Sequence, residues 1–155
     1  MTSDTSLPII QRAADDDLPR ILVLLGGAGL PTVGVAEALR GFFVAREGAN
    51  VVGVVGVEVC CDRYALLRST AVPDEWKSRG LGRKLVERAI AEAEANGIEA
   101  LYLLTTTAEH YFPSFGFARV DREEVPSEVR ATEEFASACP ASATVMTLRL
   151  TKSGS

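Results

Sequence analysis

The stretch from residue 64 to residue 107 constrains the fold more than any other part of the chain. YALLRSTAV (64–72) and ALYLLTTT (100–107) are short apolar runs, which is typical of buried β-strands. Between them, Leu81, Leu85 and Ala89 belong to an apolar stripe with helical spacing. Asn96-Gly97 then supplies a helix C-cap. A strand, a helix and a strand at this spacing predict a βαβ crossover, so the two strands should be parallel.

The flanking segments predict the rest of a mixed sheet with helices packed against it. Further strands are expected at 9–12, 42–46, 51–60, from 117 onward and at 144–150. Strand 51–60 is apolar on both faces and should be central. Further helices are expected at 15–25, from Thr32 to Leu39, at 108–115 and within 125–138. We therefore expect one α/β domain over 8–150 with six or seven strands, and flexible tails at 1–7 and 151–155.

Composition and charge exclude several classes of protein. The formal net charge of −5 argues against a nucleic-acid binder that relies on positive charge. No apolar run reaches the roughly 18 residues of a membrane helix, and MTSDTSLPII lacks the features of a secretory signal. The three cysteines, Cys60, Cys61 and Cys139, form an odd and sparse set, which favours reduced thiols in a cytoplasm.

No metal is expected. His110 is the single histidine, and one histidine cannot build a metal site, so we expect it at the surface. The pair Cys60-Cys61 suggests a metalloid-binding thiolate site. However, consecutive strand residues point to opposite faces, so small buried or rim residues are the favoured interpretation.

The loop before the central helix has the composition of an anion site. In DEWKSRGLGRKL (74–85), two glycines allow close approach to the main chain, and the N–H groups of the helix start attract anions. Four basic side chains surround them: Lys77, Arg79, Arg83 and Lys84. The loop follows a parallel strand, at the sheet edge where ligands favour binding. It is neither a P-loop nor a dinucleotide fingerprint. Taken alone, the same glycines also suit a purely structural turn.

The loop and a second motif together resemble a known family. KSRGLG (77–82) is similar to the Gln/Arg-x-x-Gly-x-Gly/Ala signature of the GCN5-related N-acetyltransferases (GNAT), and YFPSFGF (111–117) falls where that family has its Gly-Phe motif. The order of elements over residues 8–150 matches as well. LLRSTAVPDEWKSRGLG, YLLTTTAEHYF and VRATEEFASACPASA further resemble a branch that lies near bacterial arsenic-resistance genes.

The resemblance implies a site for acetyl-CoA as cosubstrate. Backbone N–H groups of the loop and the helix start would bind its pyrophosphate, and Ala71 and Val72 would pair with the pantetheine amides. The family splays the strand 64–72 from the strand 100–107, so that the thioester enters between them beside Thr105 to Thr107. The residues implied for the loop are Lys77, Ser78, Arg79, Gly80, Leu81, Gly82 and Arg83.

Phe112 occupies an informative position beside the cofactor. The family commonly has a tyrosine acid four residues before the glycine of its second motif, and here that residue is Phe112. Tyr111 precedes it and points about 100° away on a helix. Either Tyr111 substitutes or the thiolate leaves without this acid. We favour the second alternative and expect Tyr111 in the core.

Glu58 and Arg68 are the charged residues that stand out in apolar strands. Acetyl transfer needs a proton acceptor for the attacking amine, and burial would raise the pKa of Glu58 towards a useful range. Arg68 could hold an anionic group of the acceptor, with Ser69 and Thr70 as hydroxyl donors. The alternative is an ion pair between Glu58 and either Arg68 or Arg63.

The sequence therefore predicts transfer of an acetyl group from acetyl-CoA to the amine of a small, anionic, amino-acid-like acceptor. A role in detoxification or resistance would follow from the branch resemblance. Three alternatives stay open: a CoA-binding sensor with weakened chemistry, an acetyltransferase acting on protein amines, and a metalloid sensor. Relatives often dimerise, so a homodimer is also open.

Overall fold

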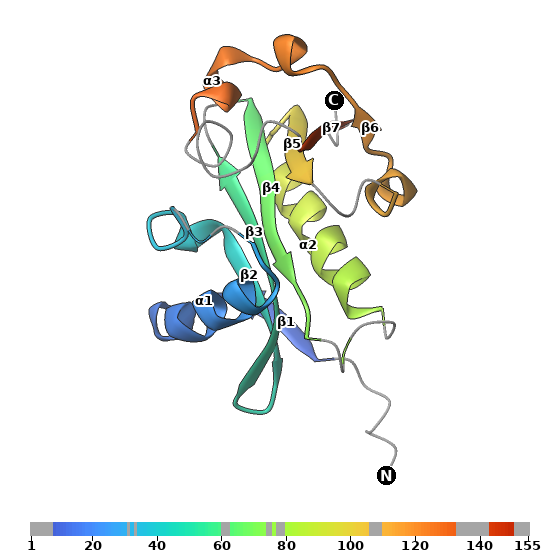
Figure 1. The fold of residues 1–155 in the computed structure, drawn as a ribbon. Coiled ribbons are helices and arrows are strands. Elements are labelled where there is room, and N and C mark those ends of the chain that lie inside the picture. The colour runs from blue at the N-terminus through green and yellow to red at the C-terminus, as the bar shows by residue number, and fades with distance from the viewer. Residues whose placement is uncertain are drawn as a thin grey trace. The chain divides into compact units, whose positions relative to one another are not determined.

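A computed structural model describes residues 8–30, 32, 34–59, 63–73, 76, 80–105, 110–132 and 143–150 (Figure 1). Seven strands form one mixed sheet in the order β1-β2-β3-β4-β5-β7-β6. This confirms the predicted α/β class, with the sheet at the upper of the two expected strand numbers. Within the described residues, no helix is long and apolar enough to cross a membrane.

Contacts divide the chain into two compact units. The first unit consists of Met1–Gly56 and Ser69–Ala89, and the second of Val57–Arg68 and Ile90–Ser155. Three elements continue from one unit into the other: β3 (Asn50–Val59), β4 (Tyr64–Ala71) and α2 (Leu81–Ala95).

The first unit begins with an antiparallel set of strands. Strand β1 (Ile9–Arg12) pairs with β2 (Phe42–Glu47), and β2 pairs with β3. Helix α1 (Leu18–Gly27) follows the 3-10 turn η2 (Asp15–Asp17) and has proline in its first turn, as the acidic cap and Pro19 predict. Ile21 and Leu25 of α1 are fully buried in a core that also contains Phe42 and Val54.

The predicted helix near Thr32 is the main correction in this unit. Residues 34–38 form turns, and only the 3-10 helix η3 (Leu39–Gly41) follows. Val35 and Leu39 are nevertheless buried, as their spacing suggested. A left-handed glycine, Gly34, lies inside this segment and disfavours a continuous α-helix.

Helix α2 follows its predicted pattern. Its buried residues recur at helical spacing: Leu81, Leu85, Val86, Ala89 and Ala93. Gly97 is left-handed, and the Ile98 N–H donates to the Ala93 carbonyl at 3.0 Å, which is a Schellman-type end. The Asn96-Gly97 cap is therefore confirmed.

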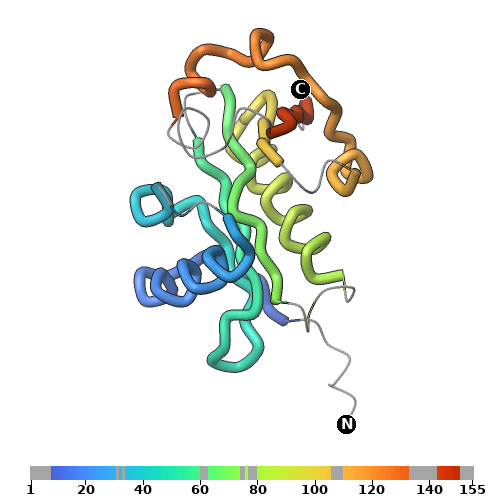
Figure 2. Tube along the Cα trace, in the orientation of Figure 1, coloured from blue at the N-terminus to red at the C-terminus, as the bar shows by residue number. Residues whose placement is uncertain are grey.

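The second unit contains the C-terminal part of the chain, from β5 to β7. Figure 2 traces it from β5 (Ala100–Thr105) through η5 (Phe112–Phe115), β6 (Ala118–Arg119), η6 (Arg122–Glu124) and α3 (Ser127–Arg130) to β7 (Thr144–Arg149). Strand β7 pairs antiparallel with both β5 and β6. Val125 and Val129 pack with Leu66, Tyr102 and Val145 in a second core. The helix predicted within 125–138 is four residues long in the described part, and the one predicted at 108–115 is the 3-10 helix η5.

Candidate functional site

Gly80 shapes the start of α2. It has φ of +82°, and its carbonyl accepts the first intrahelical hydrogen bond, from the Lys84 N–H at 3.1 Å. The N–H groups of Leu81, Gly82 and Arg83 therefore precede the first hydrogen bond of the helix. A Cβ built on Gly80 would meet no atom within 4 Å, so the glycine serves the backbone turn and leaves open space beside it.

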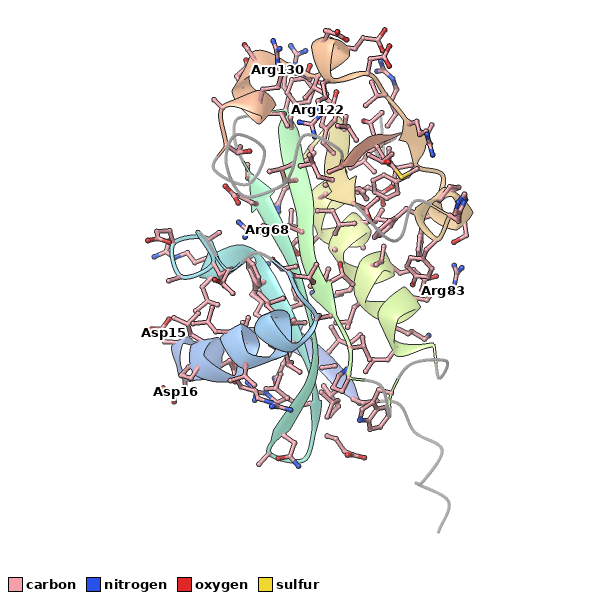
Figure 3. The ribbon with its side chains drawn as sticks, viewed as in Figure 1. Asp15, Asp16, Arg68, Arg83, Arg122 and Arg130 are labelled. Carbon is pink, nitrogen blue, oxygen red and sulfur yellow. The ribbon has the colours of Figure 1, made fainter. Side chains whose placement is uncertain are left out.

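The side chains of Leu81 and Arg83 at the start of α2 have different environments. Leu81 is fully buried and fixes the helix against the sheet. Arg83 is half exposed and lies 3.8 Å from Glu87 on the next turn, and Figure 3 labels it on α2. The Arg83 guanidinium thus places a positive charge on the first turn of α2. Lys77, Ser78 and Arg79, which were predicted to bind the cofactor, lie outside the described residues.

Trp76 was not anticipated from the sequence. Its side chain is buried although it belongs to the polar loop before α2, and its backbone N–H donates to the Pro73 carbonyl at 2.9 Å. A tryptophan within a charged loop is a usable signal, because burial of its large ring anchors a segment. Before this loop, Ala71 at the end of β4 is buried, and Val72, which follows it, is half-buried.

Strand β4 changes conformation at Ser69. This buried residue has φ of +61°, and it is the one non-glycine residue with positive φ in the described part of the chain. Such conformations cost about 1–3 kcal/mol and cluster at functional sites. Thr70 follows it and is half-buried. A serine in a strand carries no sequence signal for this geometry, so the residue was predicted only as a hydroxyl donor.

The parallel pairing of β4 with β5 is short. The register covers Tyr64↔Ala100, Ala65↔Leu101 and Leu66↔Tyr102. Yet β4 extends to Ala71, and β5 remains paired with β7 as far as Thr105↔Thr144. This pattern, in the described residues, agrees with the predicted splay of the two strands.

Glu58 and Arg68 form an ion pair in the second unit. The Arg68 Nη1 donates to Glu58 Oε1 at 2.9 Å. The Arg68 side chain is 0% exposed and the Glu58 side chain 24% exposed, so the guanidinium is the deeply buried member. Of the two partners left open by the sequence, the structure selects Arg68. Arg63 instead lies 3.5 Å from Glu99 at the surface. Figure 3 labels Arg68 on β4.

The aromatic segment after β5 corrects one prediction. Phe112 is buried and makes edge contacts with Tyr111 and Phe117. Tyr111 is 40% exposed, so the expectation that it lies in the core was wrong. The chain leaves Tyr111 at the cap of η5 while Phe112 turns inward. His110 is exposed, as predicted.

Two threonines and three cysteines complete the residues singled out in the sequence. Thr105 is half-buried at the end of β5, while Thr107, Cys60, Cys61 and Cys139 lie outside the described residues. Across the part of the chain that the structure describes, no group of three or more His, Cys, Asp or Glu residues could hold a metal ion.

Comparison with known sequences identifies relatives of one kind. A family model described as an acetyltransferase (GNAT) domain matches residues 38–119. An uncharacterised N-acetyltransferase of Chlorobaculum tepidum is 30% identical over 95 residues, which are 61% of this chain and 61% of the relative. The amino-acid acetyltransferase of Escherichia coli K12 is 38% identical over 65 residues, which are 42% of this chain and 15% of that protein. The chain thus spans less than two thirds of the length of these curated relatives.

Solved structures share the fold over nearly the whole chain. The protein Rv2747 of Mycobacterium tuberculosis, solved in complex with CoA and NLQ, has a TM-score of 0.80 at 22% identity, covering 93% of this chain and 100% of that one. N-acetylglutamate synthase of Neisseria gonorrhoeae, complexed with coenzyme A and N-acetyl-glutamate, has a TM-score of 0.81 at 20% identity, covering 94% and 36%. At these identities the likeness is one of fold.

Proposed function

Since this chain belongs to the GNAT family of acetyltransferases, we propose that it transfers an acetyl group from acetyl-CoA to the amine of a small, anionic, amino-acid-like acceptor. The observation that carries the proposal is the left-handed turn at Gly80, which opens the N-terminus of α2 inside the region that the family model matches. The amino-acid acetyltransferases among the relatives support the class of acceptor.

Acetyl-CoA would bind through the first unit. The N–H groups of Leu81, Gly82 and Arg83 and the partial positive charge of the helix start suit a pyrophosphate. The open space beside Gly80 lets an anion approach the main chain. We assign the remaining contacts to the loop residues Lys77, Ser78 and Arg79, and the pantetheine contacts to the backbone of Ala71 and Val72.

The second unit would supply proton transfer and charge recognition. We propose that Glu58 accepts the proton that the amine loses as its nitrogen forms a bond to the thioester carbon. The C–S bond then breaks, and the thiolate leaves and takes a proton from water, because Phe112 offers no hydroxyl. Arg68 is the counterpart for an anionic group of the acceptor, with Ser69 and Thr70 as hydroxyl donors and Thr105 and Thr107 beside the thioester.

The buried ion pair supports this division of roles. The contact of 2.9 Å keeps the proposed base and the proposed anion-binding residue together, and the Glu58 carboxylate partly offsets the field of the poorly screened guanidinium. We further propose a resistance role in which the acceptor is a toxic amino-acid-like compound, as the arsenic-resistance branch resemblance suggests.

The experiment combines binding and turnover. Gly82→Asp places a side chain and a negative charge at the start of α2, and acetyl-CoA affinity measured by calorimetry should fall at least about tenfold. Thiol release is then followed with a panel of amino acids, amino-acid antimetabolites and peptide amines. Unchanged affinity in Gly82→Asp would remove the assigned cofactor site. A panel without turnover would remove the enzyme assignment.

A CoA-binding sensor with weakened chemistry is the second candidate. The observation that favours it is the buried Phe112 at the position of the usual acid. Such a sensor would bind acetyl-CoA with normal affinity and release no thiol with any amine. Preference for peptide amines in the same panel would instead indicate a protein acetyltransferase.

A further inference from the structure

Strand β3 contains two glycines, Gly53 and Gly56, among valines. A glycine inside a strand has no side chain to pack, so it often marks a place where another part of the chain approaches closely. Because the two positions are three apart, they face opposite sides of the sheet. A Cβ on Gly56 would meet the ring of Phe42, which belongs to the same core as α1, whereas a Cβ on Gly53 would meet side chains of α2.

The approach of α2 to Gly53 is close. A Cβ built on Gly53 would lie 2.9 Å from Leu85 Cδ1 and 3.4 Å from Leu81 Cδ2. Carbon atoms pack best at about 3.5–4.0 Å, so both leucines reach the strand at this depth because Gly53 has no side chain. Leu81 and Leu85 are fully buried, and all three residues lie in the first unit.

The neighbouring strand is also small at this level. Gly53 pairs with Ala45 of β2, which is the smallest pair in the register of β2 with β3. The Ala45 Cβ would lie 3.5 Å from the added Cβ. The register shifts directly beside this pair, between Ala45 and Arg46, and such a bulge bends a strand. The first two turns of α2 therefore rest on the part of the two strands with the least side-chain bulk.

Leu81 connects this contact to the proposed acetyl-CoA site. Its side chain packs on Gly53, and its backbone N–H is the first of the three that are assigned to the pyrophosphate. A buried side chain in a close-packed core transmits displacement to its own backbone. Hydrogen bonds from N–H to oxygen have donor–acceptor distances of about 2.7–3.2 Å, so a shift of about 0.5 Å is enough to take an N–H out of this range.

We propose that Gly53 is a positioning residue for acetyl-CoA. By having no side chain, it sets how closely the start of α2 approaches β3 and thereby holds the N–H groups of residues 81–83 where the pyrophosphate needs them. This inference rests on the cofactor site proposed above. Moving Leu85 from 2.9 Å to an ordinary contact of 3.4–4 Å requires a displacement of about 0.5–1 Å. Binding sites must be held within about 0.5 Å of their working geometry, so one added methyl group should weaken this one.

The test compares Gly53→Ala with Gly56→Ala, which adds the same methyl group to the opposite face of the same strand. In calorimetric titration with acetyl-CoA, Gly53→Ala should bind about tenfold more weakly. Gly56→Ala should bind within about twofold of the unaltered chain, although its added Cβ meets Phe42 at the shorter distance of 2.5 Å. In turnover, Gly53→Ala should raise the KM for acetyl-CoA and leave kcat within about twofold.

A compensating variant separates positioning from a general loss of stability. Leu85→Val removes the Cδ atoms that the new methyl group would meet, so Gly53→Ala combined with Leu85→Val nearly conserves the volume of the core. We expect the double variant to bind acetyl-CoA within about twofold of the unaltered chain. If Gly53→Ala is too unstable for calorimetry, thermal melting with and without acetyl-CoA gives the same comparison, because a ligand raises Tm more when it binds more tightly.

Weaker binding by Gly53→Ala supports the proposal if the double variant restores it and Gly56→Ala does not share it. Unchanged binding by Gly53→Ala, equal losses in the two glycine variants, or a loss that persists in the double variant would overturn the role of Gly53. The proposed function survives those results as long as the unaltered chain binds acetyl-CoA and Gly82→Asp weakens that binding. Absence of acetyl-CoA binding by the unaltered chain would overturn both.

Discussion

The ion pair between Glu58 and Arg68 allows the structural and chemical roles of Glu58 to be separated. Glu58→Gln removes one charge and leaves the Arg68 guanidinium, whose side chain is 0% exposed, without its carboxylate. Breaking a buried pair typically costs about 3–5 kcal/mol. Because Glu58 is 24% exposed, water reaches one end of the pair, and we expect the low end of that range, about 3 kcal/mol.

Replacing both members of the ion pair should restore part of the lost stability. Glu58→Gln with Arg68→Met replaces both charges, and such replacements are often neutral in stability or favourable. The double variant should therefore be more stable than Glu58→Gln alone, with a coupling energy of about 1–3 kcal/mol. If Glu58 is the proton acceptor, kcat at saturating acceptor should stay about 10²–10⁴-fold lower in the double variant despite the recovered stability, while the loss of Arg68 should raise the KM for the acceptor.

Urea unfolding at pH 7 and thermal melting measure the stability term. A loss of about 3 kcal/mol lowers Tm by about 6–12 °C in a chain of this size. The surface pair Arg63–Glu99 is the matched control, and Glu99→Gln should leave Tm unchanged because both side chains are well exposed. Additive effects of the two substitutions would refute the coupling. Recovery of kcat together with stability would show that Glu58 is not the proton acceptor.

Three further predictions concern packing, acid stability and the leaving group. Gly56→Ala would place a Cβ 2.5 Å from the buried ring of Phe42, so we expect a loss of about 1–3 kcal/mol in urea unfolding, and an unchanged midpoint would contradict the packing. For Asp17, burial alone would raise the pKa, but hydrogen bonds from Arg46 and a backbone N–H outweigh it, and the pKa lies below its usual value. The charged carboxylate thus stabilises the fold above the unfolded-state pKa of about 3.9, and this contribution disappears as the pH falls through the folded value. Asp17→Asn should then destabilise by about 1–3 kcal/mol at pH 7 and progressively less below pH 4, and a pH-independent loss would contradict this. Finally, Tyr111→Phe should leave kcat unchanged, since an exposed tyrosine is not expected to act as the acid; a fall of about 10²-fold would reverse that assignment.

Local patterns predicted the parts of the fold that depend on periodicity. The apolar stripe of α2 and the cap at Asn96-Gly97 are both local signals, and the structure contains both. The strands at 9–12, 42–46 and 64–72 appear within one residue of their expected limits. These features are determined by residues that are close together in the sequence, so they can be predicted from one sequence alone.

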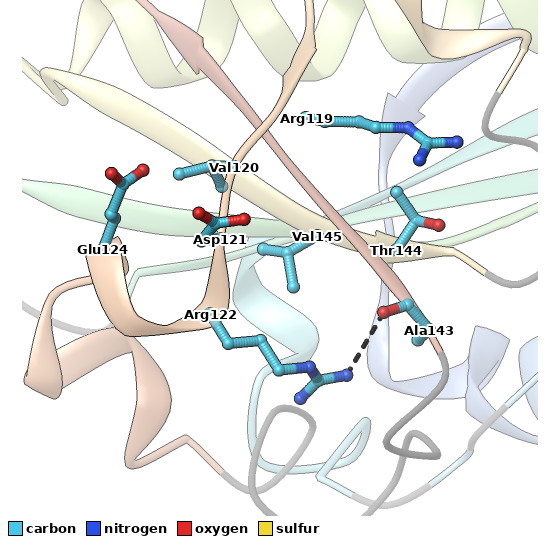
Figure 4. Close-up of a pocket in the computed structure, with 8 residues that line it drawn as sticks. All are labelled: Arg119, Val120, Asp121, Arg122, Glu124, Ala143, Thr144 and Val145. Atoms are coloured by element: carbon cyan, nitrogen blue, oxygen red, sulfur yellow. Dashed lines mark hydrogen bonds between the residues drawn. The ribbon is translucent and has the colours of Figure 1, made fainter.

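Features set by tertiary register could not be predicted in the same way. The sequence offered both Arg63 and Arg68 as partners for Glu58, and only the alignment of strands selects one. The left-handed Ser69 carries no compositional signal, because serine is ordinary in a strand. The pocket lined by residues 119–122, 124 and 143–145 is another example (Figure 4): its two segments lie about 20 positions apart in the sequence, and the pairing of β6 with β7 brings them together.

The chain also separates the proposed tasks between its two units. The residues 80–83, which are assigned to the acetyl-CoA phosphates, lie in the first unit, whereas Glu58 and Arg68 lie in the second. Strand β4 passes from one unit to the other between Arg68 and Ser69, where its backbone becomes left-handed. Contacts within each unit hold residues 80–83 and the Glu58–Arg68 pair in place. A substitution in one of these groups should therefore leave the role of the other group intact. Gly82→Asp should therefore weaken acetyl-CoA binding at least about tenfold, whereas Glu58→Gln should leave acetyl-CoA affinity unchanged. Weaker acetyl-CoA binding in Glu58→Gln would mean that the first unit depends on the second, and the separate assignment of the two sets of residues would fail.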